Sequence, residues 1–185
     1  MKSDFALLCY KAALEYNSAF KLVSSDQLYA GDQCVLIFER LTSFLQHAAS
    51  VSLVFFPSTS GSKNKTDVEI KRESRGRHLQ SIFEIDKNNS LYDRNLRNHL
   101  THTDERIDLW CEKSKSRNQF RYNVGPIEGI LNGPNVDSIL DYFEHFDADT
   151  NKFIFRGEVY DLSSIAASLS IVKDKAENLM SHKFT

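Results

Sequence analysis

Three side chains with complementary chemistry lie within one short run of the chain: Arg97, Asn98 and His102. An imidazole titrates near neutral pH, so it can accept or release a proton during a reaction. A guanidinium stays charged, and its planar fork binds two phosphate oxygens at once. An amide can orient either partner. A proton-transfer group, a charged group and an orienting amide of this kind could converge on one ligand.

The stretch that must position these residues, from Asn89 to Lys113, contains no glycine or proline and predicts one long helix. Ser90 is the expected N-cap, and Asp93 places an acid in the first turn. With about 100° of rotation per residue, one narrow stripe of this helix is nearly all apolar and should face a core. The stripe contains Leu96, Leu100, Thr103, Ile107 and Trp110.

The opposite side of the expected helix is polar and would face a ligand. It carries Arg94, Asn98, Thr101, Glu105 and Asp108, with Arg97 and His102 at its flanks. We therefore expect Arg97, Asn98 and His102 to form the catalytic group, because the long arginine side chain can bend toward the other two. Arg94 and Thr101 would contact the substrate. His99 leans toward the edge of the apolar stripe.

A second interpretation of the same residues is a solvated helix surface. Asp93 precedes Arg97 by four residues, which is the favourable order for an exposed ion pair on a helix. A histidine on a polar face is usually inert. The spacing of Arg97, Asn98 and His102 is what favours chemistry over a plain surface.

The run Arg97-Asn98-His99-Leu100-Thr101-His102 resembles the R-N-x-x-x-H signature of HEPN domains, a helical family that includes many prokaryotic toxin and defence ribonucleases. The resemblance implies a HEPN-like helical bundle and metal-independent cleavage of RNA. One branch of the family has a tyrosine two places after the histidine, which a partner antitoxin modifies. Asp104 occupies that place here, so this regulatory scheme is not expected.

The resemblance implies a reaction in which the ribose 2′-hydroxyl attacks the adjacent phosphate, giving a cyclic phosphate and a free 5′-hydroxyl. His102 would transfer protons, Arg97 would stabilise the phosphorane charge, and Asn98 would orient the phosphate or the imidazole. Because one motif supplies one histidine for two proton transfers, a homodimer is expected. Two alternatives remain open: a non-catalytic helical module that binds a partner or a nucleotide, and a toxin-like protein silenced by an antitoxin or another regulatory partner.

The composition fits one globular domain over residues 1–185, with 41% hydrophobic and 26% charged residues. A formal charge of −2 excludes a globally basic nucleic-acid-binding protein. A local basic run does contain Lys71, Arg72 and Arg75, and these residues complete the expected substrate-binding set. Such a run suits a phosphate backbone, although a solvated face is the usual explanation.

A second basic run is interleaved with two aromatic residues. It contains Lys113, Lys115, Arg117, Phe120, Arg121 and Tyr122. Charge and ring stacking together can bind single-stranded nucleic acid. A polar loop held in place by its two rings is the favoured interpretation.

The three cysteines are widely spaced and odd in number, which indicates reduced thiols and a cytoplasmic protein. No apolar run is long enough to span a bilayer, so no membrane association is expected. Neither a metal nor a cofactor is expected. The Asp147-x-Asp149-x-Asn151 turn matches the start of a calcium loop, but it lacks the glycine at the sixth place and the glutamate at the twelfth.

The whole pattern predicts a mainly α fold, a HEPN-like bundle of four or five helices with a small C-terminal β-hairpin. The second helix has a broad apolar face that fits the centre of the bundle, or both core packing and dimerisation. Residues 57–66 should form a mobile loop, and residues 139–157 should form the hairpin. Helices are expected over Asp4–Leu22, Asp26 to about Val54, through Leu79 to Ile85, and Asp161–His182; strands are expected at Asp141–Phe146 and Lys152–Phe155, joined by a turn at Asp147–Asn151.

Overall fold

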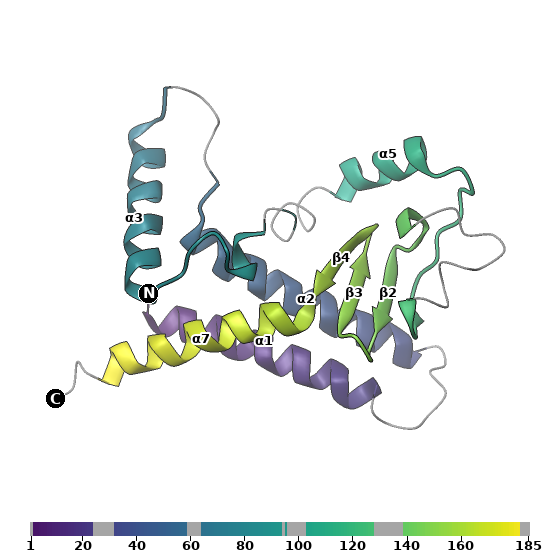
Figure 1. Ribbon diagram of the computed structural model, residues 1–185, viewed down its shortest axis with the longest axis horizontal. Helices are drawn as coiled ribbons and strands as arrows, with labels where there is room; N and C mark the ends of the chain where they lie inside the picture. The colour runs from purple at the N-terminus through teal and green to yellow at the C-terminus, as the bar shows by residue number, and fades with distance from the viewer. Residues whose placement is uncertain are drawn as a thin grey trace.

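Three long helices form the larger layer of the molecule in the computed structural model (Figure 1). The structure describes residues 2–23, 32–58, 64–93, 95, 103–127 and 139–181. Helix α1 spans Lys2–Val23, α2 spans Asp32–Phe55 and α7 spans Leu162–Ser181. Helix α1 packs along both α2 and α7. These three predicted helices are confirmed, and residues 26–31 of the second prediction lie outside the described part.

The core lies between these helices and a small sheet, with α2 at its centre. The apolar side chains of α2 recur every three to four residues, so they share one side of the helix. Nine of them are buried, namely Ile37, Phe38, Leu41, Phe44, Leu45, Ala48, Ala49, Val51 and Phe55, whereas Leu36 and Leu53 on the same helix are 43% and 40% exposed. This face therefore serves packing within the chain.

The sheet has four strands in the order β1-β2-β3-β4, and its pairs are antiparallel except for the parallel β1–β2 pair. Strand β1 is Asn123–Val124, β2 is Glu144–Asp147, β3 is Lys152–Phe155 and β4 is Glu158–Asp161. Phe146, Phe153 and Tyr160 are neighbours across the sheet and are all buried. The Phe146 ring lies 5.5 Å from that of Phe20 on α1, and the Phe153 ring lies 5.8 Å from that of Phe38 on α2. This aromatic face attaches the sheet to the helices.

The expected hairpin of β2 and β3 is confirmed, but the fold adds β4, which the sequence analysis missed. Arg156 and Gly157 join β3 to β4, with φ of 51° and 79°. Two successive positive φ values suit the two-residue turn of a tight hairpin. A Cβ on Gly157 would also lie 2.9 Å from Cδ2 of Leu140. The hairpin thus becomes a three-stranded meander that leads directly into α7, and Asp161 caps α7 by accepting the Ser164 N–H at 2.9 Å.

The prediction of a single helix from Asn89 to Lys113 is wrong at its N-terminal end. A short 3₁₀ helix, η1, spans Ser90–Tyr92, and Asp93 leaves the helical conformation with a ψ of 119°. The α-helix α5 spans Thr103–Lys113. Asn89, rather than Ser90, is the cap, and it accepts the Leu91 N–H at 3.0 Å. Asn and Asp side chains compete with helical hydrogen bonds in this way, because they bond to nearby backbone N–H groups.

The prediction that the apolar stripe of this helix faces a core is also wrong at one described position. Ile107 on α5 is 42% exposed and does not face a core. Trp110 is half-buried, and its ring lies 5.6 Å from that of Phe143. Leu96 and Leu100 lie outside the described residues. Helix α5 therefore contacts the sheet region through its C-terminal part.

Helix α3 spans Asp67–Phe83, so the basic run of the sequence forms the exposed first half of a helix that was predicted only from Leu79 onward. Thr66 begins it with a capping box, in which the Thr66 side chain and the Glu69 side chain each bond to the other's backbone N–H. Glu84 ends it in the left-handed conformation, with a φ of 54°. Thr66 belongs to the segment expected as a mobile loop, and the structure gives it this capping role; residues 59–63 lie outside the described part.

No helix in the described ranges is long and apolar enough to cross a bilayer.

Gly76 is the point at which α3 meets the end of α2, and we expect Gly76→Ala to destabilise the protein. A Cβ there would lie 2.7 Å from Cδ of Pro57 and 2.8 Å from the carbonyl oxygen of Phe55. Helix propensity alone favours alanine by about 1 kcal/mol, but overpacking of this kind costs roughly 1–3 kcal/mol. Urea unfolding measures the sum. Ser74→Ala, at an exposed place on the same helix, is the control and should be neutral or slightly stabilising; a stabilised Gly76→Ala variant would contradict the close packing.

Candidate functional site

The three expected catalytic residues lie outside the described part of the chain. This applies to Arg97, Asn98 and His102, and also to Thr101 and the side chain of Arg94. The structure does describe both flanks of this motif segment, residues 96–102. Asn95 precedes the segment, and α5 begins at Thr103 directly after it. The surroundings of the site can therefore be built from its two ends.

Both flanks of the motif segment are bonded to one carboxylate, that of Glu158 at the start of β4. Asn95 donates from Nδ2 to Oε2 of Glu158 at 3.5 Å. Arg106, in the first turns of α5, donates from a terminal guanidinium nitrogen to Oε1 at 3.2 Å. The backbone N–H of Asn95 also donates to Oδ1 of Asp93 at 2.8 Å, which further fixes this residue. The two ends of the motif segment thus meet at the edge strand of the sheet.

Tyr160 lies two residues beyond Glu158 and is buried among these groups. Burial raises the pKa of the Tyr160 hydroxyl far above its usual range, and the charges of Asp93 and Glu158 act in the same direction. Arg106 opposes this shift. Tyr160 therefore stays neutral, and its hydroxyl is a poor candidate for proton transfer near neutral pH.

The first turn of α5 carries two acidic residues, Asp104 and Glu105. Acids at a helix N-terminus stabilise the helix through its dipole. They also occupy the electropositive end of the helix that would otherwise attract a phosphate. The N-terminus of α5 therefore attracts a phosphate beside the motif segment less strongly than a helix without these acids would.

The expected substrate-binding residues Lys71, Arg72 and Arg75 lie exposed on α3. Helices α3 and α5 stand at opposite ends of the view in Figure 1. Two cations of the same region are paired with Glu73, namely Lys65 and Arg77. Within one copy of the chain, the structure does not bring α3 to the flanks of the motif segment.

The second basic run is a loop held by its aromatic rings, as the favoured interpretation predicted. Phe120 stacks on Tyr142 with centroids 5.2 Å apart, and its N–H donates to the Asp141 carbonyl at 2.8 Å. The Arg121 guanidinium makes a two-bond pair with Glu144, at 2.9 and 3.2 Å. The Phe120 ring is thus used for packing, whereas the Tyr122 ring lies 5.6 Å from that of Phe38 and remains 37% exposed.

A buried polar cluster around β2 was missed by the sequence analysis. Asp141 is fully buried and accepts hydrogen bonds from the hydroxyls of Ser114 and Ser116, at 2.6 and 2.8 Å. These bonds attach the C-terminal end of α5 to the segment that leads into β2. The sequence signal was present in the acidic and polar residues of 141–147, but alternation alone suggested that one face of the strand would be exposed. Every residue from 141 to 147 is buried.

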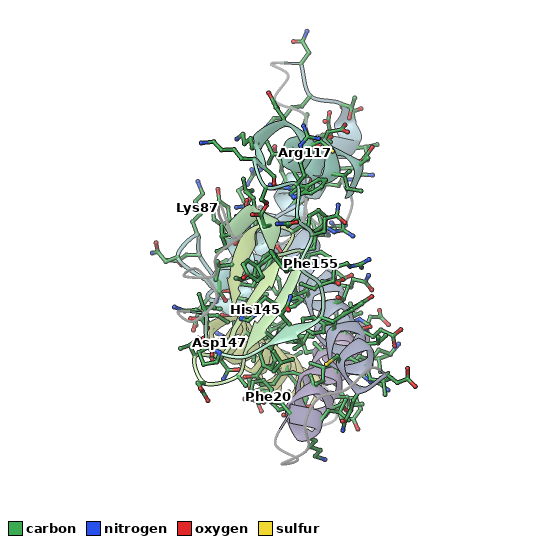
Figure 2. All side chains as sticks on the ribbon, turned by 90° about the vertical axis from the view of Figure 1, so that its right-hand side faces the viewer. Phe20, Lys87, Arg117, His145, Asp147 and Phe155 are labelled. Carbon is green, nitrogen blue, oxygen red and sulfur yellow. The ribbon has the colours of Figure 1, made fainter. Side chains whose placement is uncertain are left out.

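His145 lies on β2 beside Asn123 of β1, and its side chain is fully buried (Figure 2). Neither ring nitrogen has a hydrogen-bond partner of good geometry in the part of the chain that the structure describes, and the same holds for Nδ2 of Asn123. Burial lowers the pKa of His145, while the backbone of Gly125 and the carboxylate of Asp147 act against this shift. The ring is therefore a neutral, buried group rather than a solvated base.

Asp147 has a structural role in the turn that had been compared with a calcium loop. Its carboxylate accepts the backbone N–H groups of Ile127, Asp149 and Thr150, at 3.1, 3.0 and 3.0 Å. Burial alone would raise the pKa of Asp147, but these bonds hold it below its ordinary value. Among the residues described, no group of His, Cys, Asp and Glu side chains could hold a metal ion.

We expect the stability of the protein to fall as the pH is lowered from about 7 through 6.5 and below. Below 6.5, the ordinary pKa of the histidine ring, the unfolded chain binds a proton that buried His145 does not bind in the folded state. Unfolding free energies measured with urea at several pH values should show this slope, and His145→Phe should reduce it. Burial also lowers the pKa of His47, so the His145→Phe variant should keep a residual slope of the same sign. His78→Gln, on the exposed face of α3, is the control, and a slope unchanged in His145→Phe would refute the assignment.

Comparison with known proteins gives no relative for this chain. No family model matches it, no curated protein matches it, and no solved structure matches it. A functional assignment therefore depends on the chain's own residues and their geometry.

Proposed function

We propose that this chain is a metal-independent endoribonuclease of the HEPN type, which cleaves RNA by attack of the ribose 2′-hydroxyl on the adjacent phosphate. The observation that carries the proposal is the R-N-x-x-x-H run whose two flanks, Asn95 and Arg106, are bonded to the same carboxylate of Glu158. A catalytic segment must be held with sub-ångström precision to be effective. Anchors at both ends of the run support such a role.

In this mechanism His102 moves the protons, because its imidazole can serve as base for the 2′-hydroxyl and as acid for the leaving 5′-oxygen. Arg97 holds the phosphate with two parallel hydrogen bonds and stabilises the charge of the phosphorane. Asn98 orients the phosphate or the imidazole. The acidic first turn of α5 makes Arg97 the more important, since the helix N-terminus is already occupied by Asp104 and Glu105.

The proposal includes a contact between RNA and the projecting first half of α3. Lys71, Arg72 and Arg75 are exposed there, which suits nonspecific phosphate binding. A homodimer is also part of the proposal, because the one motif histidine of each chain, His102, cannot be acid and base at the same time. In a dimer, α3 of one copy could approach the motif segment of the other, which one copy alone does not achieve.

The proposed environment is a reducing cytoplasm. The cysteines Cys9, Cys34 and Cys111 are all free, as expected for such a compartment. A regulatory protein of the antitoxin kind would then act by covering the motif segment.

The second candidate function is a non-catalytic module that binds a protein partner or a nucleotide through the same segment. The acidic groups beside the motif segment favour the protein-binding form of this function, since Asp93, Asp104, Glu105 and Glu158 all weaken the attraction of an anionic ligand. The nuclease proposal requires Arg97 and the α3 cations to outweigh these charges.

One assay separates the two functions. Purified protein is incubated with mixed RNAs in EDTA, and the products are examined for 2′,3′-cyclic phosphate and 5′-hydroxyl ends. Cleavage with these ends supports the nuclease. Binding of RNA or nucleotide without cleavage supports the non-catalytic module and overturns the enzymatic proposal.

Glu158→Ala should lower kcat by roughly 10- to 100-fold and change KM little, because it releases both flanks of the motif segment. Glu158→Gln should recover only part of the loss, because Asn95 and Arg106 donate to different carboxylate oxygens and the single amide oxygen can replace only one of them. Glu112→Ala, which removes an exposed acid on α5, is the matched control. Steady-state cleavage of a defined RNA measures all three variants. An unchanged kcat in Glu158→Ala, or a loss confined to KM, would show that Glu158 does not position the segment.

A further inference from the structure

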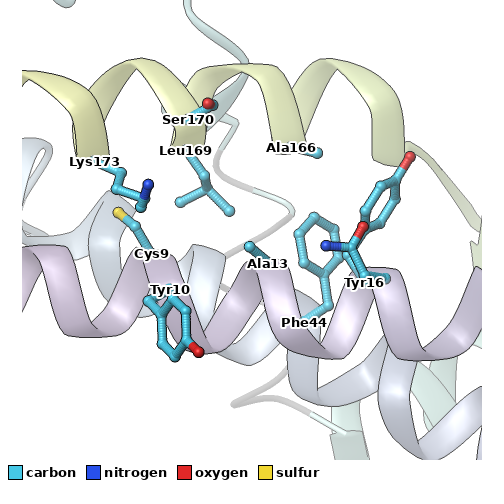
Figure 3. Close-up of a pocket in the computed structure, with 10 residues that line it drawn as sticks. Cys9, Tyr10, Ala13, Tyr16, Phe44, Ala166, Leu169, Ser170 and Lys173 are labelled. Carbon is cyan, nitrogen blue, oxygen red and sulfur yellow. The ribbon is translucent and has the colours of Figure 1, made fainter.

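A pocket of about 280 Å³ lies between α1 and α7, above α2 (Figure 3). Its floor consists of buried side chains, those of Cys9, Phe44 and Leu169. Its rim is more exposed and includes Asn17 and Ser170. An apolar floor with a few polar groups at the rim is the usual composition of a small-molecule site.

The pocket exists because two small residues lie where the helices face each other. Ala13 on α1 and Ala166 on α7 both line it, and neither side chain fills the space between the helices. Closely packed helices normally close such gaps with larger side chains, because an empty apolar space forfeits contacts. These two alanines shape the space, so replacing either of them by a larger residue should close it.

One end of the pocket carries a positive charge. In Figure 3, Lys173 and Cys9 lie at one end, whereas Tyr16 lies at the other. Lys173 approaches Glu177 at 3.5 Å and Asp174 at 3.9 Å, but both acids are on the same helix and at least half-exposed, so these pairs are weak. Burial raises the pKa of Cys9 to about 12, so the neighbouring thiol is neutral and offers Lys173 no counter-charge.

We propose that this pocket binds a small aliphatic carboxylate, with the chain between Ala13 and Ala166 and the carboxylate at Lys173. The volume of about 280 Å³ equals that of about nine water molecules at roughly 30 Å³ each. A ligand of about ten non-hydrogen atoms, such as an eight-carbon fatty acid, matches this size. The site is separate from the motif segment, and its existence does not depend on the proposed ribonuclease activity.

Octanoate is the probe for the test, with octanol and octylammonium as comparators of equal length. Isothermal titration should give a Kd for octanoate below about 1 mM, at least tenfold tighter than for either comparator. Ala166→Leu should weaken octanoate binding at least tenfold by filling the space. Ala167→Leu adds the same side chain at an exposed neighbouring place and should bind octanoate as the wild type does.

Lys173→Met tests the charge without touching the floor of the pocket. This variant should bind octanoate about as weakly as the wild type binds octanol. Circular dichroism checks that each variant is folded, and Lys173→Met keeps the test decisive if Ala166→Leu does not fold. The proposal is overturned if wild-type protein binds no octanoate at about 1 mM, if Ala166→Leu binds it undiminished, or if octanol and octanoate bind equally well.

Discussion

Replacing His102 by alanine is expected to lower the rate of RNA cleavage by roughly 10²- to 10⁴-fold, which is the usual contribution of general acid–base catalysis by one side chain. Arg97→Ala should cause a comparable loss. Arg97→Lys should also be poor, because a point charge cannot replace the two parallel hydrogen bonds of a guanidinium. The rates are measured with a defined RNA in EDTA.

His99→Ala is the control for these variants, since His99 belongs to the same segment but not to the R-N-x-x-x-H pattern. It should retain cleavage. Activity that survives His102→Ala would overturn the mechanism. Activity that disappears when EDTA is added would show that a metal is required, and either result would leave the non-catalytic module as the better account of the motif.

The second large effect is expected in stability rather than in activity. Phe153→Ala should lower the free energy of unfolding by about 3–5 kcal/mol, the usual loss for a phenylalanine removed from a close-packed core. Phe153 is fully buried in the central strand β3, and its ring contacts Phe38 on α2 and stacks on Phe155. Its removal leaves a cavity where the sheet meets the helices.

Urea unfolding followed by circular dichroism measures this loss. Tyr10→Ala is the matched control, because it also truncates an aromatic ring, but one that is 52% exposed on α1. The control should change the unfolding free energy by less than about 1 kcal/mol. A similarly small change for Phe153→Ala would show that the sheet is not attached to the helices through this aromatic face.

The helices at the two ends of the chain could be predicted because their signals are local. Apolar residues recur with helical spacing in α1, α2 and α7, and Asp161 stands directly before the last of them as a cap. The β2–β3 hairpin likewise follows from alternation around a polar turn. In such segments, the sequence pattern and the tertiary packing require the same conformation.

The break after Tyr92 could not be predicted from periodicity, although its residues were visible. Asn89 and Asp93 both bond to nearby backbone N–H groups, and this competes with a continuous helix that the hydrophobic pattern alone would allow. The Leu91 side chain between them is fully buried and lies against α2 and α7. Burial of this one residue depends on distant parts of the chain, which a local pattern does not contain.

The burial of β2 on both faces could not be predicted from the sequence pattern either. Asp141 and His145 look like surface residues in an alternating strand, yet Asp141 is satisfied by Ser114 and Ser116, and His145 lies beside Asn123. Those contacts come from a parallel pairing and from a loop more than twenty residues away along the chain. Of the candidate site, the motif residues came from the sequence, whereas the bonds of the flanking Asn95 and Arg106 to Glu158 came from the structure.

The position of Glu158 also has a consequence for the order in which the protein is made. A ribosome completes residues 95–106 well before it reaches Glu158, and β4 passes directly into α7, the last helix that the structure describes. Until that helix has emerged and packed along α1, the carboxylate that binds Asn95 and Arg106 has no fixed place. A nascent chain would therefore carry an unanchored motif until β4 and α7 have been made, and the proposed cleavage activity would begin only then. For the proposed ribonuclease, this delay would limit cleavage of the message from which the protein is being translated.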